Sequence, residues 1–469
     1  MTTKSELSKK FLVVAAVFVM VIALVAMSAC QPTNTTSTTD KPAEVKGTPS
    51  PAGTPTMAKN DNGVWTAEAW KDIYPEQYRT FDQNKLNDTD GNTDPYFEAR
   101  GDMVALYPMI KTIWNPSPFN TYYNEPNGHP YSLDDIRVTG RIFDAATQTY
   151  KATAFSNCYT CKSADYTAIL NKDGVAAYQL PFGDADLTKK IVEPISCYNC
   201  HANNLEKDYT EASLKVTQPF FTTGEGKVDE GSRTCGQCHN EYYFKPADRS
   251  VTNPYDSLEN MNAEAMYEFY KTAGKDGAAF VDYTNPLTKV GQLKTQHPEF
   301  EFIFGDGGSS MSKRINPQTG EKFGCADCHM GNKQVSADGV EYTSHLLISP
   351  LDNPELLKTT CEVAGCHADS SGKGTLKAQV EAWQEESEGK VKSIGTKIED
   401  LTKKLADAVA AGSLDAAKLA EVQELNRQAV WYWDFVMVEN SEGSHNPTMS
   451  NKVLGLSETA VDKALGLLG

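Results

Sequence analysis

Ten cysteines in five close pairs are the feature that most constrains what this chain can fold into. Three pairs have the form Cys-x-x-Cys-His, beginning at Cys197, Cys235 and Cys325. A fourth begins at Cys158 and reads Cys-Tyr-Thr-Cys-Lys, while the fifth begins at Cys361 and has four residues between its cysteines before a histidine. A histidine directly after the second cysteine is typical of c-type haem attachment, in which two thioether bonds hold the macrocycle and the imidazole binds the iron.

Disulfide bonds and zinc ribbons are the other common uses of paired cysteines. Neither explains a histidine directly after the second cysteine in four of the five pairs. We therefore expect five covalently attached haem c groups. Their attachment and proximal ligand residues are Cys158, Cys161 and Lys162; Cys197, Cys200 and His201; Cys235, Cys238 and His239; Cys325, Cys328 and His329; and Cys361, Cys366 and His367.

The polypeptide between the motifs offers few strand-like runs, and irregular stretches rich in Gly, Asn and Asp fill it. Large apolar macrocycles can supply the buried surface that such a chain lacks. We expect a mainly α fold, with short helices and long loops around the haems. The acidic residues outnumber the basic ones by 62 to 44, a net charge of −18, which argues against a nucleic-acid-binding protein.

The chain after His367 has the periodicity of long helices. Gly412-Ser413 ends a first helix, and we expect a second from about Leu414 to Val438 and a short closing helix from Glu458 to about Leu468. The first helix carries one apolar stripe at three- and four-residue steps, formed by Ile394, Ile398, Leu401, Leu405 and Val409.

The N-terminus reads as a targeting segment. Lysines precede an uncharged apolar run that ends at residue 29, and Cys30 follows as a possible lipid-attachment site. Residues 1–29 are therefore a signal peptide or a membrane anchor, and both place the rest of the chain outside the cytoplasm, tethered to a membrane. Residues 30–62 form a Thr/Pro/Ser-rich linker that we expect to be flexible. Residues 63–469 form one haem-binding domain, including a C-terminal helical region at 372–469.

Histidine is scarce in this chain, which makes each one informative. Four of the eight follow the cysteine pairs. Electron-carrying haems commonly have a second axial ligand on the opposite face of the iron. The candidates for that role are the four remaining histidines, His129, His297, His345 and His445.

The order of these motifs resembles the pentahaem cytochrome c nitrite reductases, which form ammonia. The resemblance covers roughly residues 65–465 and rests first on C-Y-T-C-K, followed by three C-x-x-C-H motifs and a final haem motif. It extends to C-G-Q-C-H-N-E-Y-Y-F from Cys235 and to L-K-T-Q-H-P-E from Leu293. The segments Y-N-E-P-N-G-H, ending at His129, and Y-T-S-H, ending at His345, also match in type and order.

The resemblance implies that Lys162 is the proximal ligand of the catalytic haem and that the opposite face of this iron is open to substrate. An amine binds iron only when deprotonated, so the site must be buried enough to disfavour the ammonium form. Tyr242 and His297 correspond to the active-site tyrosine and histidine. The catalytic domain would then occupy residues 63–469, and its long C-terminal helices would form a homodimer interface.

Other roles also follow from the resemblance. His129 would be the distal ligand of the haem on Cys235/Cys238, His345 that of the haem on Cys197/Cys200, and His445 that of the haem on Cys325/Cys328. A Ca²⁺ ion beside the catalytic haem would be bound by oxygen donors, as calcium prefers. These donors are the Glu241 and Gln296 side chains and the backbone of Tyr242 and Lys294.

The chain departs from the family pattern at two places. Thr121 occupies the position of the substrate-binding arginine, and a hydroxyl cannot replace a positive charge. Arg100 and Arg137 are alternative sources of that charge. Residues 298–324 contain no histidine to serve as the distal ligand of the haem on Cys361/Cys366, and Met311 is the soft ligand available there.

Three functions are therefore compatible with the sequence. The first is reduction of nitrite to ammonium, with electrons supplied by a membrane quinol-oxidising cytochrome or another donor. The second is a related reductase acting on another small substrate, such as hydroxylamine or sulfite, as the Thr121 departure allows. The third is an electron relay without catalysis, although a relay has no need of an open iron site at Lys162.

Overall fold

The computed structural model describes residues 57–86, 102–124, 126, 128–201, 214–317, 319–331, 333–362, 367 and 375–469. The predicted targeting segment 1–29, Cys30, most of the 30–62 linker, Arg100 and Cys366 lie outside these residues. Within the described ranges, no helix is both long and apolar enough to cross a membrane.

Helices dominate the described residues and the strands are short, which confirms the predicted fold class. The helices before the third cysteine pair are α2 (Ala67–Lys71), α3 (Pro75–Asp82), α4 (Met103–Leu106), α5 (Ile110–Ile113), α6 (Ser132–Val138), α7 (Ala164–Asp173), α8 (Ala185–Lys190) and α9 (Cys197–Cys200). The later helices are α10 (Glu230–Gly236), α11 (Ala263–Tyr270), α12 (Glu299–Phe304), α13 (Cys325–His329), α14 (Pro354–Leu356), α15 (Leu376–Ala411), α16 (Ala416–Met437) and α17 (Pro447–Leu468).

The strands that the structure describes form antiparallel pairs, each made of two neighbours in the chain. No pair extends into a larger sheet within these residues, so the strands fix local loops and do not form a core layer. The pairs are β1 (Phe143–Asp144) with β2 (Thr149–Tyr150), β3 (Tyr243–Phe244) with β4 (Val251–Thr252), β5 (Tyr283–Thr284) with β6 (Gly291–Gln292), and β7 (Lys333–Val335) with β8 (Glu341–Thr343).

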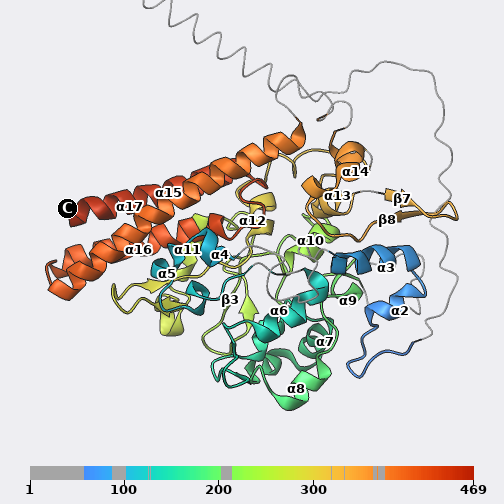
Figure 1. Ribbon diagram of the computed structural model, residues 1–469, viewed down its shortest axis with the longest axis horizontal. Helices are drawn as coiled ribbons and strands as arrows, with labels where there is room; N and C mark the ends of the chain where they lie inside the picture. The colour runs from blue at the N-terminus through green and yellow to red at the C-terminus, as the bar shows by residue number, and fades with distance from the viewer. Residues whose placement is uncertain are drawn as a thin grey trace, which may run out of the picture.

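The three C-terminal helices pack side by side along one edge of the molecule (Figure 1). Helices α2 and α3 and the β7–β8 hairpin lie on the opposite side. Between them are the short helices that carry the cysteine pairs, since α9 contacts α10 and α10 contacts α13. The motifs at Cys197, Cys235 and Cys325, far apart in the sequence, are therefore neighbours in the fold.

The predicted apolar stripe of α15 is confirmed, because Ile394, Ile398, Leu401 and Leu405 are buried and Val409 packs against the same core. The helix ends where expected, with Gly412 in the left-handed conformation at φ 59°. Helix α16 starts slightly later than predicted, after Asp415, whose side chain accepts hydrogen bonds from the amides of Ala417 and Lys418.

The prediction of a short closing helix from Glu458 was wrong, because α17 begins at Pro447 and has 22 residues. Asn446 caps its N-terminus by accepting a hydrogen bond from the Met449 amide, and proline is well suited to the first helical position. These start signals lie directly after His445, so the cap of α17 also fixes the position of that histidine.

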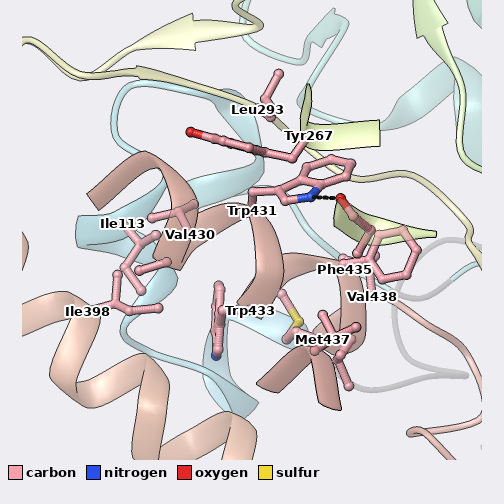
Figure 2. Packing of buried hydrophobic residues seen from close by; sticks show 14 of the residues in the cluster. Ile113, Tyr267, Leu293, Ile398, Val430, Trp431, Trp433, Phe435, Met437 and Val438 are labelled. Atoms are coloured by element: carbon pink, nitrogen blue, oxygen red, sulfur yellow. Dashed lines mark hydrogen bonds between the residues drawn. The ribbon is translucent and has the colours of Figure 1, made fainter. Parts of the chain in front are cut away.

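Helix α16 is the centre of the C-terminal core, and two fully buried tryptophans point from it in opposite directions (Figure 2). Trp431 Nε1 donates to the carbonyl oxygen of Ala263 in α11 at 2.9 Å. Trp433 Nε1 donates to the carbonyl oxygen of Val391 in α15 at 2.8 Å. Helix α16 is thereby held between α15 and α11.

Candidate active site and metal centres

The C-Y-T-C-K motif begins in a 3₁₀ turn (Ser156–Tyr159) and ends just before α7. The fully buried Tyr159 ring stacks on Phe182 with ring centres 4.0 Å apart. The carbonyl oxygen of Lys162 accepts a hydrogen bond from Ser132 Oγ at 2.8 Å, and Ser163 caps α7. Packing on both sides therefore fixes the backbone that positions the Lys162 side chain.

The structure brings Lys162, Tyr242 and His297 together around this motif. Burial lowers the pKa of His297 to about 4 against the opposing charge of Glu299, and Lys162 lies close enough to act on this ring. Burial, followed by the neighbouring thiols of Cys161 and Cys158, raises the pKa of Tyr242 well above its usual value. At neutral pH, His297 is therefore an uncharged imidazole and Tyr242 keeps its hydroxyl proton.

His297 also carries an unsatisfied polar atom. Its Nδ1 is buried and has no hydrogen-bond partner among the described residues, whereas its backbone amide donates to the carbonyl oxygen of Asn240 at 3.4 Å. Buried polar side-chain atoms in folded proteins are rarely left without a partner. This imidazole therefore has the environment of a side chain that interacts with a bound group.

Three pairs of histidines have the spacing of axial ligands. Two imidazoles on opposite sides of one metal ion have ring centres roughly 6 Å apart, since each metal–nitrogen bond is about 2 Å long. The observed ring-centre distances are 6.3 Å for His129 and His239, 6.1 Å for His201 and His345, and 6.3 Å for His329 and His445. These are the three pairings that the resemblance implied.

His297 lies at a similar ring-centre distance from His239, 6.4 Å, so spacing alone does not distinguish it from His129. His239 lies deep inside the chain and nevertheless has 44% of its side-chain surface exposed. It therefore lines an internal space, as a residue facing a macrocycle must. The ring spacing, this space and the orphaned His297 nitrogen all fit bound haem.

Two of these histidines contact buried carboxylates that the sequence had not indicated. The Nδ1 atom of His445 lies 2.5 Å from Glu439 Oε1, and His239 Nδ1 lies 3.4 Å from Glu299 Oε2. His345 Nδ1, in contrast, lies 3.0 Å from the carbonyl oxygen of Thr343. A carboxylate on the outer nitrogen fixes the ring orientation and makes the imidazole a stronger electron donor to a metal.

The local sequence around the third motif explains its shape. A Cβ atom on Gly236 would lie 2.3 Å from the Phe300 ring, so only glycine fits at the first position after Cys235. The Gln237 side chain is buried and accepts hydrogen bonds from the amides of Thr217 and Gln218. Both residues between Cys235 and Cys238 are therefore required by packing.

The cysteine pairs follow one another in space in an order different from that in the chain. Cys161 lies beside Cys238, Cys235 lies beside Cys325, and Cys328 lies near Cys361. Cys200 lies near Cys235 and Cys238. The first, third, fourth and fifth motifs thus form a series of neighbours, and the second lies beside the third.

The donors predicted for calcium meet at one place. The Gln296 amide donates to Glu241 Oε2 at 2.7 Å, and Gln296 Nε2 donates to the carbonyl oxygen of Lys294 at 3.0 Å. Tyr242 follows Glu241 directly in the chain. Carboxylate, amide and carbonyl oxygens are the donors that Ca²⁺ prefers, so this set fits the ion.

Buried acids surround Glu241. Burial raises the pKa of Glu241 well above its usual value, that of Glu301 to about 8 and that of Asp282 to about 6. Glu301 Oε2 has no hydrogen-bond partner among the described residues. In the described part of the chain, no group of three His, Cys, Asp or Glu side chains could hold a metal ion. The predicted calcium donors include one such side chain, Glu241, and the others are amide and backbone oxygens.

Lys294 contributes a backbone oxygen to this set, while its side chain extends into a different environment. Its Nζ lies 3.1 Å from both carboxylate oxygens of Asp434 in α16 and 4.3 Å from the Trp114 ring centre. Both charged groups are buried. The pair joins the loop that carries Gln296 and His297 to the C-terminal helices.

Thr121 is exposed, and its hydroxyl donates to Asn120 Oδ1 at 2.8 Å. It lines an open surface pocket together with Lys111 and Asp102. Of the two arginines considered as substitutes, Arg100 lies outside the described residues. Arg137 Nη2 donates to the carbonyl oxygen of Ile191 at 2.5 Å, which ties it to local packing.

The fifth motif is only partly described. His367 is half-buried, and burial, followed by the charge of Arg314, lowers its pKa. Arg314 closes a turn with Met311, since its amide donates to the Met311 carbonyl oxygen at 2.9 Å. The Met311 turn therefore lies on the same side of the molecule as His367.

These observations define the class of protein: a helical c-type cytochrome with several haem-attachment motifs, one of which has lysine where the others have histidine. The model of the cytochrome c552 family matches residues 66–468. The chain belongs to the cytochrome c552 family.

Among solved structures, the chain is similar to the catalytic subunit, NrfA, of the cytochrome c nitrite reductase from Desulfovibrio desulfuricans. The identity is 25% over 88% of this chain and 87% of that one, with a TM-score of 0.68, and that structure is described as having two calcium sites. The outer cell wall cytochrome OcwA matches 71% of this chain and 48% of its own length at 18% identity. Its TM-score of 0.36 is too low to support any argument.

Proposed function

We propose that this chain is a pentahaem reductase that converts nitrite to ammonium at the haem bound by Cys158, Cys161 and Lys162. The observation that carries this proposal is the lysine in the first motif, with His297 and Tyr242 gathered around it. A pure electron relay needs no such grouping. The family membership and the similarity to a nitrite reductase support the same conclusion.

The other four haems carry electrons. Three of these haems would be held by His239 with His129, His201 with His345, and His329 with His445, as their ring spacings support. His367 and Met311 bind the haem on Cys361/Cys366. Bound haem c supplies the redox chemistry of iron, and the protein supplies orientation and electrostatics.

The chain's own residues handle protons at the substrate. Tyr242 keeps its hydroxyl proton because its pKa is raised, and it can donate a hydrogen bond to a substrate oxygen. The neutral His297 ring can hold a proton on one nitrogen and accept another, as a general acid–base group does. Lys162 would bind the iron of this haem in place of a histidine.

Glu241, Gln296 and the backbone of Tyr242 and Lys294 would hold a calcium ion, and these donors join the loop of His297 to the segment of Tyr242. The Gln296 hydrogen bonds to Glu241 and Lys294 support this role. A divalent cation would also offset the repulsion among the buried carboxylates nearby.

The enzyme works outside the cytoplasm, tethered by lipidated Cys30 or by an N-terminal helix at 1–29, with the 30–62 linker between tether and domain. Two copies associate through the C-terminal helices, and electrons come from a membrane quinol-oxidising cytochrome or another donor. In the series of neighbouring motifs, the Cys361 motif is at the opposite end from the Lys162 motif, which supports electron entry there.

One observation favours a second candidate. Thr121 provides no positive charge where the family has arginine, which favours a reductase of hydroxylamine, an uncharged molecule. Sulfite is the other small substrate considered. Reductive turnover of nitrite, hydroxylamine and sulfite by the haem-loaded protein, with reduced viologen as donor, distinguishes them. Rapid ammonium formation from nitrite is expected. Turnover of hydroxylamine or sulfite without nitrite would assign the alternative, and no turnover of any substrate would refute both.

A further inference from the structure

The loop that holds Thr121 carries a guanidinium supplied by another segment. Arg141, in the turn after α6, donates from Nη1 to the carbonyl oxygen of Tyr122 at 3.0 Å. Its Cζ lies 4.7 Å from the centre of the Phe119 ring. These two contacts hold the charge of Arg141 on the residues that flank Thr121.

The turn of Arg141 fits closely against this loop. A Cβ atom on Gly140 would lie 2.5 Å from the Tyr122 ring, so glycine is required for the approach. Lys151 Nζ donates to the carbonyl oxygen of Gly140 at 2.6 Å and lies 5.6 Å from the Tyr122 ring centre. These contacts fix the turn of Arg141 against the Thr121 loop, and Lys151 places a second positive charge beside them.

Arg141 also lies next to the C-Y-T-C-K motif. Burial raises the pKa of Cys158 to about 11, and the Arg141 charge is the strongest influence opposing that shift, followed by a hydrogen bond from the Phe155 amide and by the charge of Lys162. A thiol feels a cation in this way only when the two are close. Geometry joins the same unit to the segment that carries His297, because Lys294 Nζ lies 5.3 Å from the centre of the Phe119 ring on which Arg141 packs. The guanidinium is therefore held on the Thr121 loop where that loop meets the segment of His297.

We propose that Arg141 supplies the anion-binding charge that Thr121 lacks, so that its guanidinium holds nitrite or another small oxyanion at the Lys162 site. The proposal rests on the proposed function, because it concerns the same substrate site. A guanidinium is planar and matches two oxygens of a small anion, which a threonine hydroxyl cannot do. Arg141 thus brings a positive charge to the place where an arginine at position 121 would have supplied it.

The test uses the full-length, haem-loaded protein. The oxidised protein is titrated with nitrite, an anion, and with hydroxylamine, which is neutral, and the haem absorbance change gives each dissociation constant. Arg141→Gln is expected to weaken nitrite binding roughly tenfold to a hundredfold, as for loss of a charge-assisted contact, with much less effect on hydroxylamine. Arg141→Lys keeps the charge and is expected to retain part of the nitrite affinity.

Arg249→Gln is the matched control, because Arg249 also stacks on an aromatic ring at this motif, with Cζ 3.5 Å from the Phe155 centre. It is expected to leave both dissociation constants unchanged. Adding Thr121→Arg to Arg141→Gln is expected to restore nitrite binding, because it returns a guanidinium to the same loop.

Unchanged nitrite affinity in Arg141→Gln, or equal weakening of both ligands, would overturn the proposal. If Arg141→Gln fails to take up its haems, Arg141→Lys is compared with wild type instead. A complete loss of the preference for nitrite over hydroxylamine in Arg141→Lys, which keeps the positive charge, would also contradict the proposal. A wild-type protein that binds nitrite through Arg141 without forming ammonium would refute the proposed function and leave this inference standing.

Discussion

Glu439 is the residue whose charge acts most directly on a proposed haem ligand. Its side chain is fully buried, lies 2.5 Å from His445 Nδ1, and is held by Ser441 and by the Gly443 amide. A carboxylate in this position donates electron density through the imidazole and favours ferric over ferrous iron.

We therefore predict that Glu439→Gln raises the reduction potential of the haem on Cys325/Cys328. The expected shift is on the order of 60 mV, which corresponds to a tenfold change in a one-electron equilibrium. Redox titration followed by absorbance measures it. Glu386→Gln, which removes an exposed charge on α15 that pairs with Lys390, is the control. A potential that stays the same or falls would contradict the role given to Glu439.

At this scale, the sequence predicts residues whose chemistry is marked by a motif. The cysteines follow from their spacing, and the role of Lys162 follows from the resemblance of the whole set of motifs. Glu299 and Glu439 carry no such mark, because their function depends on contacts with His239 and His445 that only the folded loops create. Arg141 was missed for the same reason, since nothing in the chain links it to position 121.

At the scale of elements, α15 tests the packing of the C-terminal core. A Cβ atom on Gly395 would lie 3.1 Å from both Met109 and Trp433, whereas a Cβ on Gly389 in the same helix meets nothing within 4 Å. We predict that Gly395→Val destabilises the protein by about 1–3 kcal/mol through overpacking. Gly389→Val is the matched control and should change stability little. Equal melting temperatures for the two variants would show that α15 does not pack as described.

The calcium loop provides the second test at this scale. Removing Ca²⁺ with EDTA is expected to lower the melting temperature and the turnover rate, and added Ca²⁺ is expected to restore both. At a calcium concentration of about a hundred times Kd, binding would stabilise the protein by about 2.7 kcal/mol. Glu241→Gln removes the charged donor and should make the melting temperature insensitive to Ca²⁺. A purified protein that neither contains calcium nor responds to it would contradict this site.

The elements themselves were predictable where periodicity or capping marks them, as in the stripe of α15 and its end at Gly412. The start of α17 was misjudged because the apolar pattern before Glu458 is weak, while Asn446 and Pro447 supply the actual start signals. Short helices such as α9 and α13 have no pattern of their own. They form because the cysteine motifs and their packing partners fix them.

At the scale of the whole molecule, the series of neighbouring motifs separates the proposed place of chemistry from the proposed place of electron entry. The Cys158 motif lies at one end and the Cys361 motif at the other, joined through Cys235 and Cys325. The order of the motifs in the chain does not predict their order in space, because the second motif lies beside the third and is not between the first and the third. The long C-terminal helices, which lie along one edge of the molecule (Figure 1), hold this arrangement through contacts such as Lys294 with Asp434.

The account's central claim is that one haem, the one on Cys158, Cys161 and Lys162, is open to substrate and the others are not. Electron paramagnetic resonance of the oxidised, haem-loaded protein, recorded during a nitrite titration, tests this most directly. We predict that the haem with an open coordination position responds to nitrite and that the signals of the bis-histidine haems stay unchanged. Spectra without any nitrite-sensitive haem, or with the response persisting when Cys158 and Cys161 are both replaced by alanine, would contradict it.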